Sequence, residues 1–338
     1  MDELEIGGAV DVVIPMRNGA ATIRRTLATV HAQTLQPRRI IIVDDGSNDG
    51  GPELVRGLPL VELIKTPPLG VSQARNAGIR ASRAEFIAFL DADDLWRSDK
   101  LQRQMEVARR RPEAAVITCD QVTVDETGTR ACGPRSRARY AGHAGARVLS
   151  DFGRLRGWSS IMLVRRSALL ASGGYDERLS FSEDIDICLR LAHSYAIAFS
   201  PQLMTFIVQN PGSVTRRPRT PGQVMEATLQ GAGVMEKWIG RANDPSVLAR
   251  QAAEAILKSF VRVSFDPHAL YLFRREMTVR TPCLARHIGH NDIQFFFNLG
   301  TVAVAALGPY VGRRLARAFA ACVRAVSSRS AVLPALRA

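Results

Sequence analysis

The chain has 338 residues, of which 46% are hydrophobic and 23% charged, and its net charge is +13. This share of apolar residues is enough to bury a core and excludes a disordered chain. The five cysteines are sparse, odd in number and without a Cys-x-x-Cys pair, which excludes a disulfide scaffold and favours reduced thiols in a cytoplasmic protein.

Short apolar runs predict strands throughout the first 120 residues, with helical patterns between them. The runs are rich in β-branched residues and bounded by turn residues, which is typical of buried parallel strands. This alternation predicts a doubly wound α/β sheet, whose ligands bind beyond the carboxyl ends of the strands. The expected strands are 10–14, 40–43, 60–64, 86–90 and 114–119, and the expected helices include 23–30, 74–81 and 101–110.

The pattern changes after residue 120. Residues 133–157 contain six arginines and five glycines, which predicts a mobile basic loop. An apolar run at 161–164 and a helix at 183–193 follow, and residues 216–221 are a link rich in proline and arginine. We therefore expect an α/β domain at residues 1–218 and a helical, basic extension at residues 219–338.

The loop after the first strand reads Pro15-Met16-Arg17-Asn18-Gly19. It has neither the glycine spacing of a dinucleotide-binding loop nor that of a P-loop, in which backbone amides bind phosphate. The loop therefore argues against an NAD-dependent oxidoreductase and against a P-loop NTPase.

Carboxylates follow two of the predicted strands. Asp91, Asp93 and Asp94 lie within four residues, and a divalent cation such as Mg²⁺ or Mn²⁺ would offset their repulsion. The alternative is an acidic turn before a helix near residue 98. Asp44 and Asp45 follow another strand, where a carboxylate could accept a hydrogen bond from a nucleobase or could simply form a turn.

Arg75 lies early in the helix that leads to the fourth strand, where it could bind a phosphate or a ribose, or lie on a solvated face. Glu183 and Asp184 begin a helix, and carboxylates are favoured at that end by the helix dipole. From the residues alone, these two acids are either first-turn acids or a catalytic base.

Four segments together, in order and spacing, resemble family 2 glycosyltransferases with the Rossmann-like GT-A fold. The resemblance covers about residues 9–215, and it implies metal-dependent transfer of a sugar from a nucleotide diphosphate, usually a uridine one, with inversion. It also implies a nucleotide-sugar-binding half at 1–120 and an acceptor half at 121–218. The segments are VVIPMRNGAATIRRTL, IIIVDDGSNDG, GVSQARNAGIRASRAEFIAFLDADD and SGGYDERLSFSEDIDICLRL.

The resemblance also implies roles for individual residues, carried over position by position. On the donor side, Pro15 and Arg17 line the base pocket, and Asp45 or the adjacent Asp44 reads the base. Arg75 contacts the nucleotide, and Asp91 holds the ribose. Asp93 binds Mn²⁺ or Mg²⁺, and Asp94 supports the site. The family's Glu-Asp motif is Glu183-Asp184, the expected catalytic pair, in which Asp184 is the base.

The sequence departs from the family pattern in two places. Asn210 takes the place of a histidine that often lies near the metal, and the QxxRW motif of processive synthases is missing. The second departure favours addition of a single sugar.

We expect a saccharide or lipid-linked acceptor and a role in cell-surface polysaccharide biosynthesis. Two alternatives are a nucleotidyltransferase, which would release pyrophosphate, and a non-catalytic nucleotide-sugar-binding scaffold. No zinc-finger, RRM or basic-zipper pattern occurs, so nucleic acid is not an expected partner.

The C-terminal part carries the excess positive charge. No acidic residue follows Asp292, whereas six arginines do, and residues 295–312 are apolar except for Asn298 and Thr301. This pattern predicts binding to an anionic membrane surface, with helix packing or a membrane span as alternatives. The acidic N-terminus does not resemble a signal peptide. We therefore expect a peripheral protein on the cytoplasmic face of the inner membrane.

Overall fold

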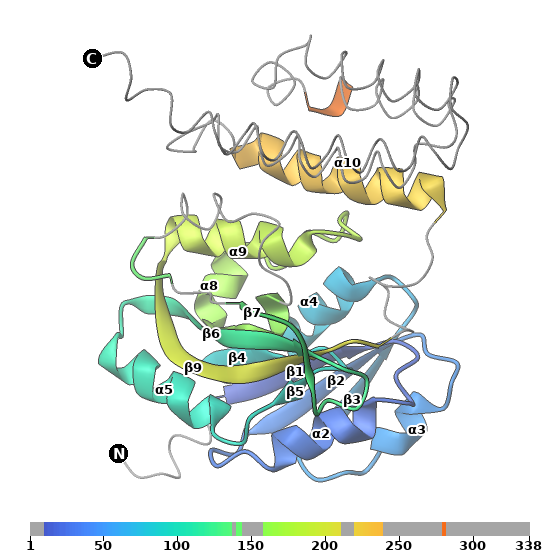
Figure 1. The fold of residues 1–338 in the computed structure, drawn as a ribbon, viewed down its shortest axis with the longest axis vertical. Helices are drawn as coiled ribbons and strands as arrows, with labels where there is room; N and C mark the ends of the chain where they lie inside the picture. The colour runs from blue at the N-terminus through green and yellow to red at the C-terminus, as the bar shows by residue number, and fades with distance from the viewer. Residues whose placement is uncertain (1–9, 137–139, 144–157, 211–219, 239–278, 282–338) are drawn as a thin grey trace. The chain divides into compact units, whose positions relative to one another are not determined.

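The structure is a computed structural model that describes residues 10–136, 140–143, 158–210, 220–238 and 279–281. The chain divides into two compact units, residues 1–217 and residues 218–338. The first unit holds a mixed β-sheet with helices on both faces (Figure 1). The second contains helix α10 (Pro221–Trp238), in which Glu226 forms an ion pair with Arg280 at 3.4 Å.

The first four strands form the parallel part of the sheet, as expected. The strand order is β3-β2-β1-β4, so the chain builds outward from β1 and then returns to its other side. Their carboxyl ends therefore meet at one edge, where open α/β sheets bind ligands. The strands are β1 (Val10–Met16), β2 (Arg39–Asp45), β3 (Val61–Thr66) and β4 (Phe86–Phe89).

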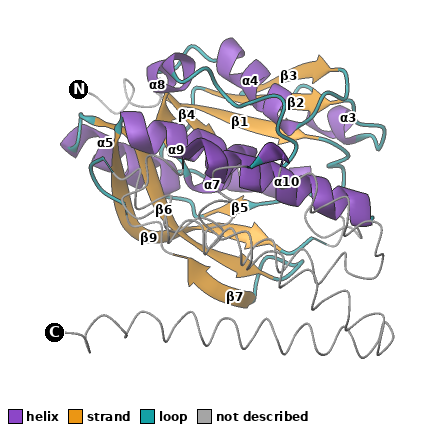
Figure 2. Cartoon of the chain, turned by 90° about the horizontal axis from the view of Figure 1, so that it is seen from above, coloured by secondary structure: helices purple, strands orange, loops and turns teal. Residues whose placement is uncertain are grey.

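The rest of the sheet is mixed in direction. Strand β8 (Leu163–Arg165) lies antiparallel between β4 and β6 (Ala114–Val124), and the long strand β9 (Ala196–Val208) runs parallel beside β6 (Figure 2). The short strand β5 (Leu95–Trp96) pairs with β9. The expected strand at 114–119 therefore exists, but an antiparallel strand separates it from the parallel set.

One expectation about this region is wrong. Residues 133–136 belong to strand β7 (Ala131–Ser136), which pairs antiparallel with β6, so the predicted basic loop does not begin at residue 133. The ladder with β6 satisfies backbone groups that a Gly- and Pro-containing segment could otherwise have left to solvent. A further bridge joins Gly142 to Ile197, and residues 144–157 lie outside the described part of the chain.

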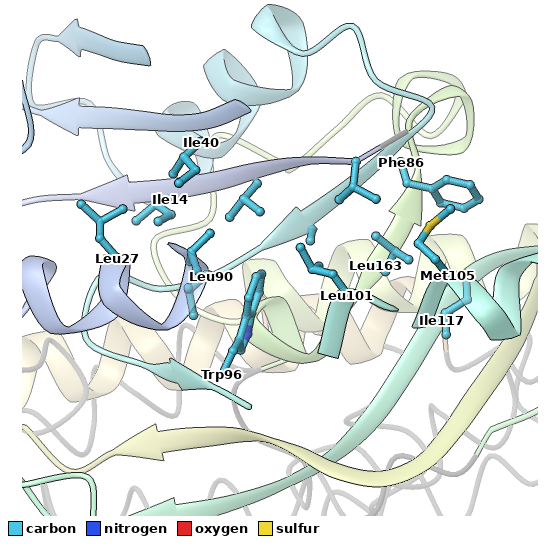
Figure 3. Close-up of a cluster of buried hydrophobic side chains, with 14 of the residues drawn as sticks. Ile14, Leu27, Ile40, Phe86, Leu90, Trp96, Leu101, Met105, Ile117 and Leu163 are labelled. Carbon is cyan, nitrogen blue, oxygen red and sulfur yellow. The ribbon is translucent and has the colours of Figure 1, made fainter. Parts of the chain in front are cut away.

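The helices cover the two faces of the sheet. Helices α2 (Ile23–His31), α3 (Gly51–Val55) and α5 (Lys100–Arg110) contribute to one apolar cluster beneath the sheet, which Figure 3 shows around Ile14, Leu27 and Trp96. Helix α4 (Val71–Ala81) covers the other face (Figure 1). Each fully buried aliphatic side chain of this cluster contributes about 1.5–3 kcal/mol to folding.

Three short or medium helices complete the first unit. They are α7 (Trp158–Ile161), α8 (Arg166–Ala171) and α9 (Glu183–Ser194). The last of these begins at the residue where a helix was expected, and it carries the Glu-Asp pair in its first turn. It places that pair on a different element from the donor-side carboxylates.

Within the described residues, none of the helices combines the length and the apolar character needed to cross a bilayer. The apolar stretch at 295–312 and the arginines after it lie outside the described residues. Their expected membrane contact therefore stays a prediction.

Candidate active site

The structure brings the predicted donor-side residues to one edge of the sheet. Pro15 is the penultimate residue of β1, and Asp44 and Asp45 end β2 beside it, with Met16 paired to Asp44 in the ladder. Arg17 follows β1 and is exposed, and its Nη1 lies 3.7 Å from Oδ2 of Asp45. The sheet order therefore explains why residues about thirty positions apart meet.

Asp44 and Asp45 are both buried, and both bind backbone amides. Oδ1 of Asp44 accepts the amide of Ser47 at 3.0 Å, which is the turn expected as the alternative to base reading. The carboxylate of Asp45 accepts the amides of Leu69 and Gly70, at 2.7 and 3.0 Å, and so holds the loop after β3. A carboxylate has about four acceptor positions, so either group can still accept a base N–H.

Asn18 and Asp49, to which the sequence reasoning assigned no individual role, join the loops after β1 and β2. The amide of Asn18 donates to Oγ of Ser47 at 2.8 Å, and Oδ1 of Asn18 accepts the amide of Asn48 at 2.9 Å. Asp49 accepts the amide of Ala20 at 2.7 Å. Asn18 has φ +52°, a left-handed conformation that asparagine tolerates better than most residues. The asparagine itself was therefore the signal in the sequence for this turn.

The acidic cluster after β4 contains carboxylates in different environments. Asp94 is buried and accepts hydrogen bonds from Oγ of Ser160 at 2.6 Å and from the amide of Val208 at 3.1 Å, so it ties β9 and α7 to the site. Burial and the neighbouring charges of Asp93 and Asp91 raise its pKa well above the usual range. Asp94 thus connects three elements, and the supporting role that the family resemblance implies for it stays a prediction.

Asp93 lies in the same concentration of negative charge. Burial, followed by repulsion from Asp91, raises the pKa of Asp93 to about 6, although a hydrogen bond with Asn210 and the charge of Arg25 act in the opposite direction. The side chain of Asn210, which replaces the family's histidine, therefore reaches Asp93. A cation beside Asp93 would remove this electrostatic cost.

The residues at this place fit a divalent metal of the hard class. Among the described residues, no group of three or more His, Cys, Asp or Glu side chains is arranged to hold a metal by itself. Mg²⁺ and Mn²⁺ sites at phosphates usually take only one or two carboxylates, and the ligand's own phosphate oxygens complete the coordination. Asp93 supplies one such carboxylate, with the partly exposed Asp91 nearby.

Arg75 connects the two groups of acids. Its Nη2 donates to Oδ1 of Asp91 at 2.8 Å and its Nη1 donates to Oε1 of Glu183 at 2.9 Å. The guanidinium is almost completely buried and lies over the ring of Tyr175, 5.1 Å from its centroid. Sequence reasoning expected Arg75 to touch the nucleotide, and the structure adds that both terminal nitrogens already bind carboxylates.

Asp184 lies next to this ion pair, in the first turn of α9. Its Oδ1 accepts the amide of Ile185 at 2.8 Å. Burial, then repulsion from Glu183, raises its pKa to about 7, and the charge of Arg75 opposes that rise. A general base with a pKa near neutrality is well matched to proton transfer at neutral pH.

Asn76 fixes the turn that precedes α9, a role that sequence reasoning missed. Its Nδ2 donates to the carbonyl of Tyr175 and its Oδ1 accepts the amide of Tyr175, at 2.9 and 2.8 Å. Gly174 has φ +70°, and a Cβ there would lie 2.5 Å from Oδ1 of Asn76. The adjacent pair Arg75-Asn76 therefore positions both the Glu-Asp motif and the Gly-Gly-Tyr turn.

Comparison with known proteins identifies the family of the domain that holds this site. Residues 11–170 match the family model described as glycosyl transferase family 2. The chain carries a family 2 glycosyltransferase domain. The expected enzyme class, a glycosyltransferase, is confirmed at the level of the family.

Curated relatives of this glycosyltransferase domain point to polysaccharide biosynthesis. The amylovoran biosynthesis glycosyltransferase AmsB of Erwinia amylovora is 30% identical over 197 residues, which are 53% of this chain and 62% of AmsB. The succinoglycan biosynthesis protein ExoO of Rhizobium meliloti is 37% identical over 127 residues, or 36% of each chain. The matched region thus spans less than two thirds of either relative.

A solved structure shows the same fold. The crystal structure of S. aureus TarS 1-349 in complex with UDP-GlcNAc has a TM-score of 0.59 at 16% identity, and the match covers 89% of this chain and 92% of that chain. The expected GT-A α/β fold is confirmed.

Proposed function

We propose that the chain transfers a sugar from a nucleotide diphosphate donor, most simply a UDP-sugar, to a hydroxyl of a saccharide or lipid-linked acceptor, with inversion. One observation carries the proposal: Asp184, a carboxylate whose pKa is raised to about 7, lies beside an arginine that binds Asp91 at the donor edge of the sheet and Glu183 next to Asp184. Such an arrangement supplies a base on one side and a diphosphate site on the other.

The donor side is assigned from the sheet edge. Pro15 and Arg17 would border the base, Asp45 or Asp44 would accept its N–H, and Asp91 would hold the ribose. TarS, which shares the fold, was crystallised in complex with UDP-GlcNAc, and this supports a uridine donor here. Arg17 is 56% exposed and Arg75 is buried, so of these two arginines Arg17 is the more accessible to a ligand.

Asp93 would hold Mn²⁺ or Mg²⁺. When bound, such a cation supplies neutralisation of the charge that develops on the departing diphosphate. Asp94 and Asn210 would keep the Asp93 carboxylate in place, since Asp94 binds the backbone of β9 and Asn210 hydrogen-bonds Asp93.

The transfer step follows from the position of Asp184. Asp184 takes the proton of the acceptor hydroxyl as its oxygen forms a bond to the anomeric carbon, and the bond from that carbon to the diphosphate oxygen breaks. The electron pair leaves with the nucleoside diphosphate. Attack from the face opposite the leaving group inverts the anomeric centre through an oxocarbenium-like transition state.

The acceptor and the place of action rest on relatives and on the sequence. AmsB and ExoO are named for the biosynthesis of amylovoran and succinoglycan, so a growing cell-surface polysaccharide is the proposed acceptor class. The basic, apolar residues after Asp292 support action at the cytoplasmic face of the membrane.

A panel of nucleotide sugars with Mn²⁺ tests this function. We expect slow release of UDP from one donor in the absence of acceptor, faster release with saccharide acceptors, and little release by Asp184→Asn. Release of pyrophosphate would instead indicate a nucleotidyltransferase. Donor binding without any release in the presence of acceptor extracts would indicate a scaffold.

A further inference from the structure

Three charged side chains from separate elements form one cluster around a buried arginine, which we call the Arg75 ion cluster: Arg75, Asp91 and Glu183. Arg75 comes from α4, Asp91 follows β4, and Glu183 begins α9, 108 residues away from Arg75. Both contacts are short and charged, at 2.8 and 2.9 Å, and the arginine side chain is only 4% exposed. Such charge-assisted pairs fix geometry more strongly than neutral hydrogen bonds do.

The two acids of the Glu-Asp pair differ in their surroundings. Oε1 of Glu183 is bound by the guanidinium of Arg75, and the Glu183 side chain is 13% exposed. Asp184 instead accepts the amide of Ile185, which belongs to its own turn. The Glu183 carboxylate is therefore engaged in a charge-assisted contact with another element, whereas the hydrogen bond of Asp184 stays within its own turn.

The backbone before this pair is constrained as well. Ser182 has φ +64°, and φ values in this range are unusual for serine. Its carbonyl accepts the amide of Asp186 at 3.0 Å, which closes the first turn of α9. The first turn therefore needs an anchor that holds it in this conformation, and the contact of Glu183 with Arg75 provides one.

We propose that Glu183 is a positioning residue and not a second base: through Arg75 and Asp91 it fixes the first turn of α9 to the donor edge of the sheet, and so sets where Asp184 lies relative to the donor. This inference rests on the proposed function and deepens it. It assigns separate tasks to the two adjacent acids, and it makes Arg75 the link between the donor side and the base.

The proposal has an electrostatic consequence that can be measured. The charged and titratable groups around Asp184 are Glu183 and Cys188 on its own helix, Arg75 on α4, Asp91 after β4, and Tyr175 before the helix. Glu183 and Asp91 raise the pKa of Asp184 above its usual range, and Arg75 lowers it. Removing one charge from the Arg75 ion cluster must therefore move the pH at which Asp184 loses its proton.

The first experiment uses Glu183→Gln, which keeps an oxygen that can accept from Arg75 but loses the negative charge. We expect the acidic limb of the kcat/KM profile to move to lower pH by roughly one unit. Above that limb, kcat should fall by less than about tenfold, far from the ~10²–10⁴-fold loss typical of removing a general base. Glu85→Gln is the matched control, because Glu85 also pairs with an arginine, Arg165, but lies outside the site, and its profile should not move.

The second experiment removes the arginine. Arg75→Met should move the acidic limb in the opposite direction, to higher pH, and should lower kcat more than Glu183→Gln does. Adding Glu183→Gln to Arg75→Met should bring the limb back toward its original pH. This return separates electrostatic positioning from a general loss of stability, which would lower the amount of active enzyme without moving the limb.

A readout without turnover separates failure of this inference from failure of the proposed function. The ¹³C resonance of the Asp184 carboxylate, assigned with Asp184→Asn, should titrate near pH 7 in the full chain and at lower pH in Glu183→Gln, even if no nucleotide sugar is turned over. If Glu183→Gln abolishes transfer at every pH, Glu183 is a base. If it moves neither the profile nor the resonance, Glu183 does not position Asp184, and either result overturns the inference.

Discussion

Asp184 is the residue on which the proposed chemistry depends. Its carboxylate lies in the first turn of α9, and burial with repulsion from Glu183 raises its pKa to about 7. The carboxylates on the donor side have other partners: Asp91 binds Arg75, and Asp93 is contacted by Asn210. The proton of the acceptor hydroxyl therefore needs a base elsewhere, and Asp184 is the residue that we propose for it.

We predict that Asp184→Asn removes transfer almost completely while leaving donor binding nearly unchanged. Asparagine keeps the size and the local hydrogen bond but cannot take a proton, so kcat should fall by about 10²–10⁴-fold. Donor affinity, measured by calorimetry with UDP, should change by less than about tenfold. Asp186→Asn is a suitable control, because Asp186 lies on the same helix but pairs with Arg190 at 2.8 Å. Near wild-type transfer by Asp184→Asn would contradict the assignment.

A separate prediction concerns the metal. Asp93→Ala should abolish the Mn²⁺-dependent part of UDP binding and leave the fold intact, since the pKa of Asp93 is raised and its charge costs stability. Calorimetry with and without EDTA measures this part directly. Glu113→Ala removes an exposed acid paired with Arg111 and should leave UDP binding as it is. Equal UDP binding with EDTA, or equal binding by Asp93→Ala, would show that Asp93 holds no metal.

At the scale of elements, α4 connects the sheet with the turn and the helix that carry the Glu-Asp pair. It carries Arg75 and Asn76, which hold the first turn of α9 and the turn before it, and Gly78, where a Cβ would lie 2.4 Å from Cγ1 of Val13. The glycine allows α4 to approach β1 closely, and this approach brings Arg75 to the end of the strands. A single helix therefore sets the distance between the donor edge and the Glu-Asp pair.

The turn before α9 offers a matched pair of substitutions. Gly173 and Gly174 both have positive φ, at +78° and +70°, but a Cβ at Gly173 would meet open space and one at Gly174 would overlap Asn76. We predict a loss of unfolding free energy of about 1–2 kcal/mol for Gly173→Ala, from backbone strain alone. Gly174→Ala should lose about 1–3 kcal/mol more, from the overlap. Urea denaturation measures both, and equal losses would contradict the role given to Asn76.

Local patterns predicted the parallel half of the sheet because most of those strands are short, buried apolar runs. They could not predict β7, whose pairing with β6 depends on contacts between strands and not on its own composition. The same holds within the site. The family motif identified Arg75 and Glu183 separately, but their contact joins residues 108 positions apart, and only the packing of the folded chain determines it.

For the whole molecule, the raised pKa values make a prediction about stability and pH. The pKa values of Asp184 and Asp93 are about 7 and about 6 in the folded chain, against 3.8 as the ordinary value. At a pH between the unfolded and the folded pKa values, Asp184 and Asp93 keep protons in the folded chain that they have lost in the unfolded chain. The stability that these two groups contribute is therefore full below about pH 4 and falls as the pH rises toward 7. We expect the Tm of the ligand-free protein to fall from about pH 5 to about pH 8.

Substitution of Asp184 tests which group causes this fall. Asp184→Asn removes the charge, so it should flatten part of the curve and stabilise the ligand-free protein near pH 8 by roughly 1–2 kcal/mol, after allowance for partial exposure of the carboxylate. Calorimetric melting at a series of pH values measures this. A Tm that rises over that range, or an unchanged slope in Asp184→Asn, would contradict it.

The charge asymmetry of the whole chain leads to a last prediction. Because six arginines and no acid follow Asp292, the full chain should sediment with phosphatidylglycerol vesicles at low salt, and high salt should release it. Truncation near residue 292 should abolish sedimentation, and phosphatidylcholine vesicles serve as the control. A full chain that stays in the supernatant at low salt would contradict this, and loss of folding on truncation would favour helix packing.

The hydrogen bonds between the loops after β1 and β2 have a consequence for the thermodynamics of donor binding. Asn18 binds Ser47 and Asn48, and Asp49 binds Ala20, so the backbone around the proposed base site is already ordered without a ligand. Ordering a loop on binding costs conformational entropy, and a site formed in advance avoids much of that cost. If this edge binds the base as proposed, we expect even a free nucleoside to bind it measurably, because the loops need no ordering on binding.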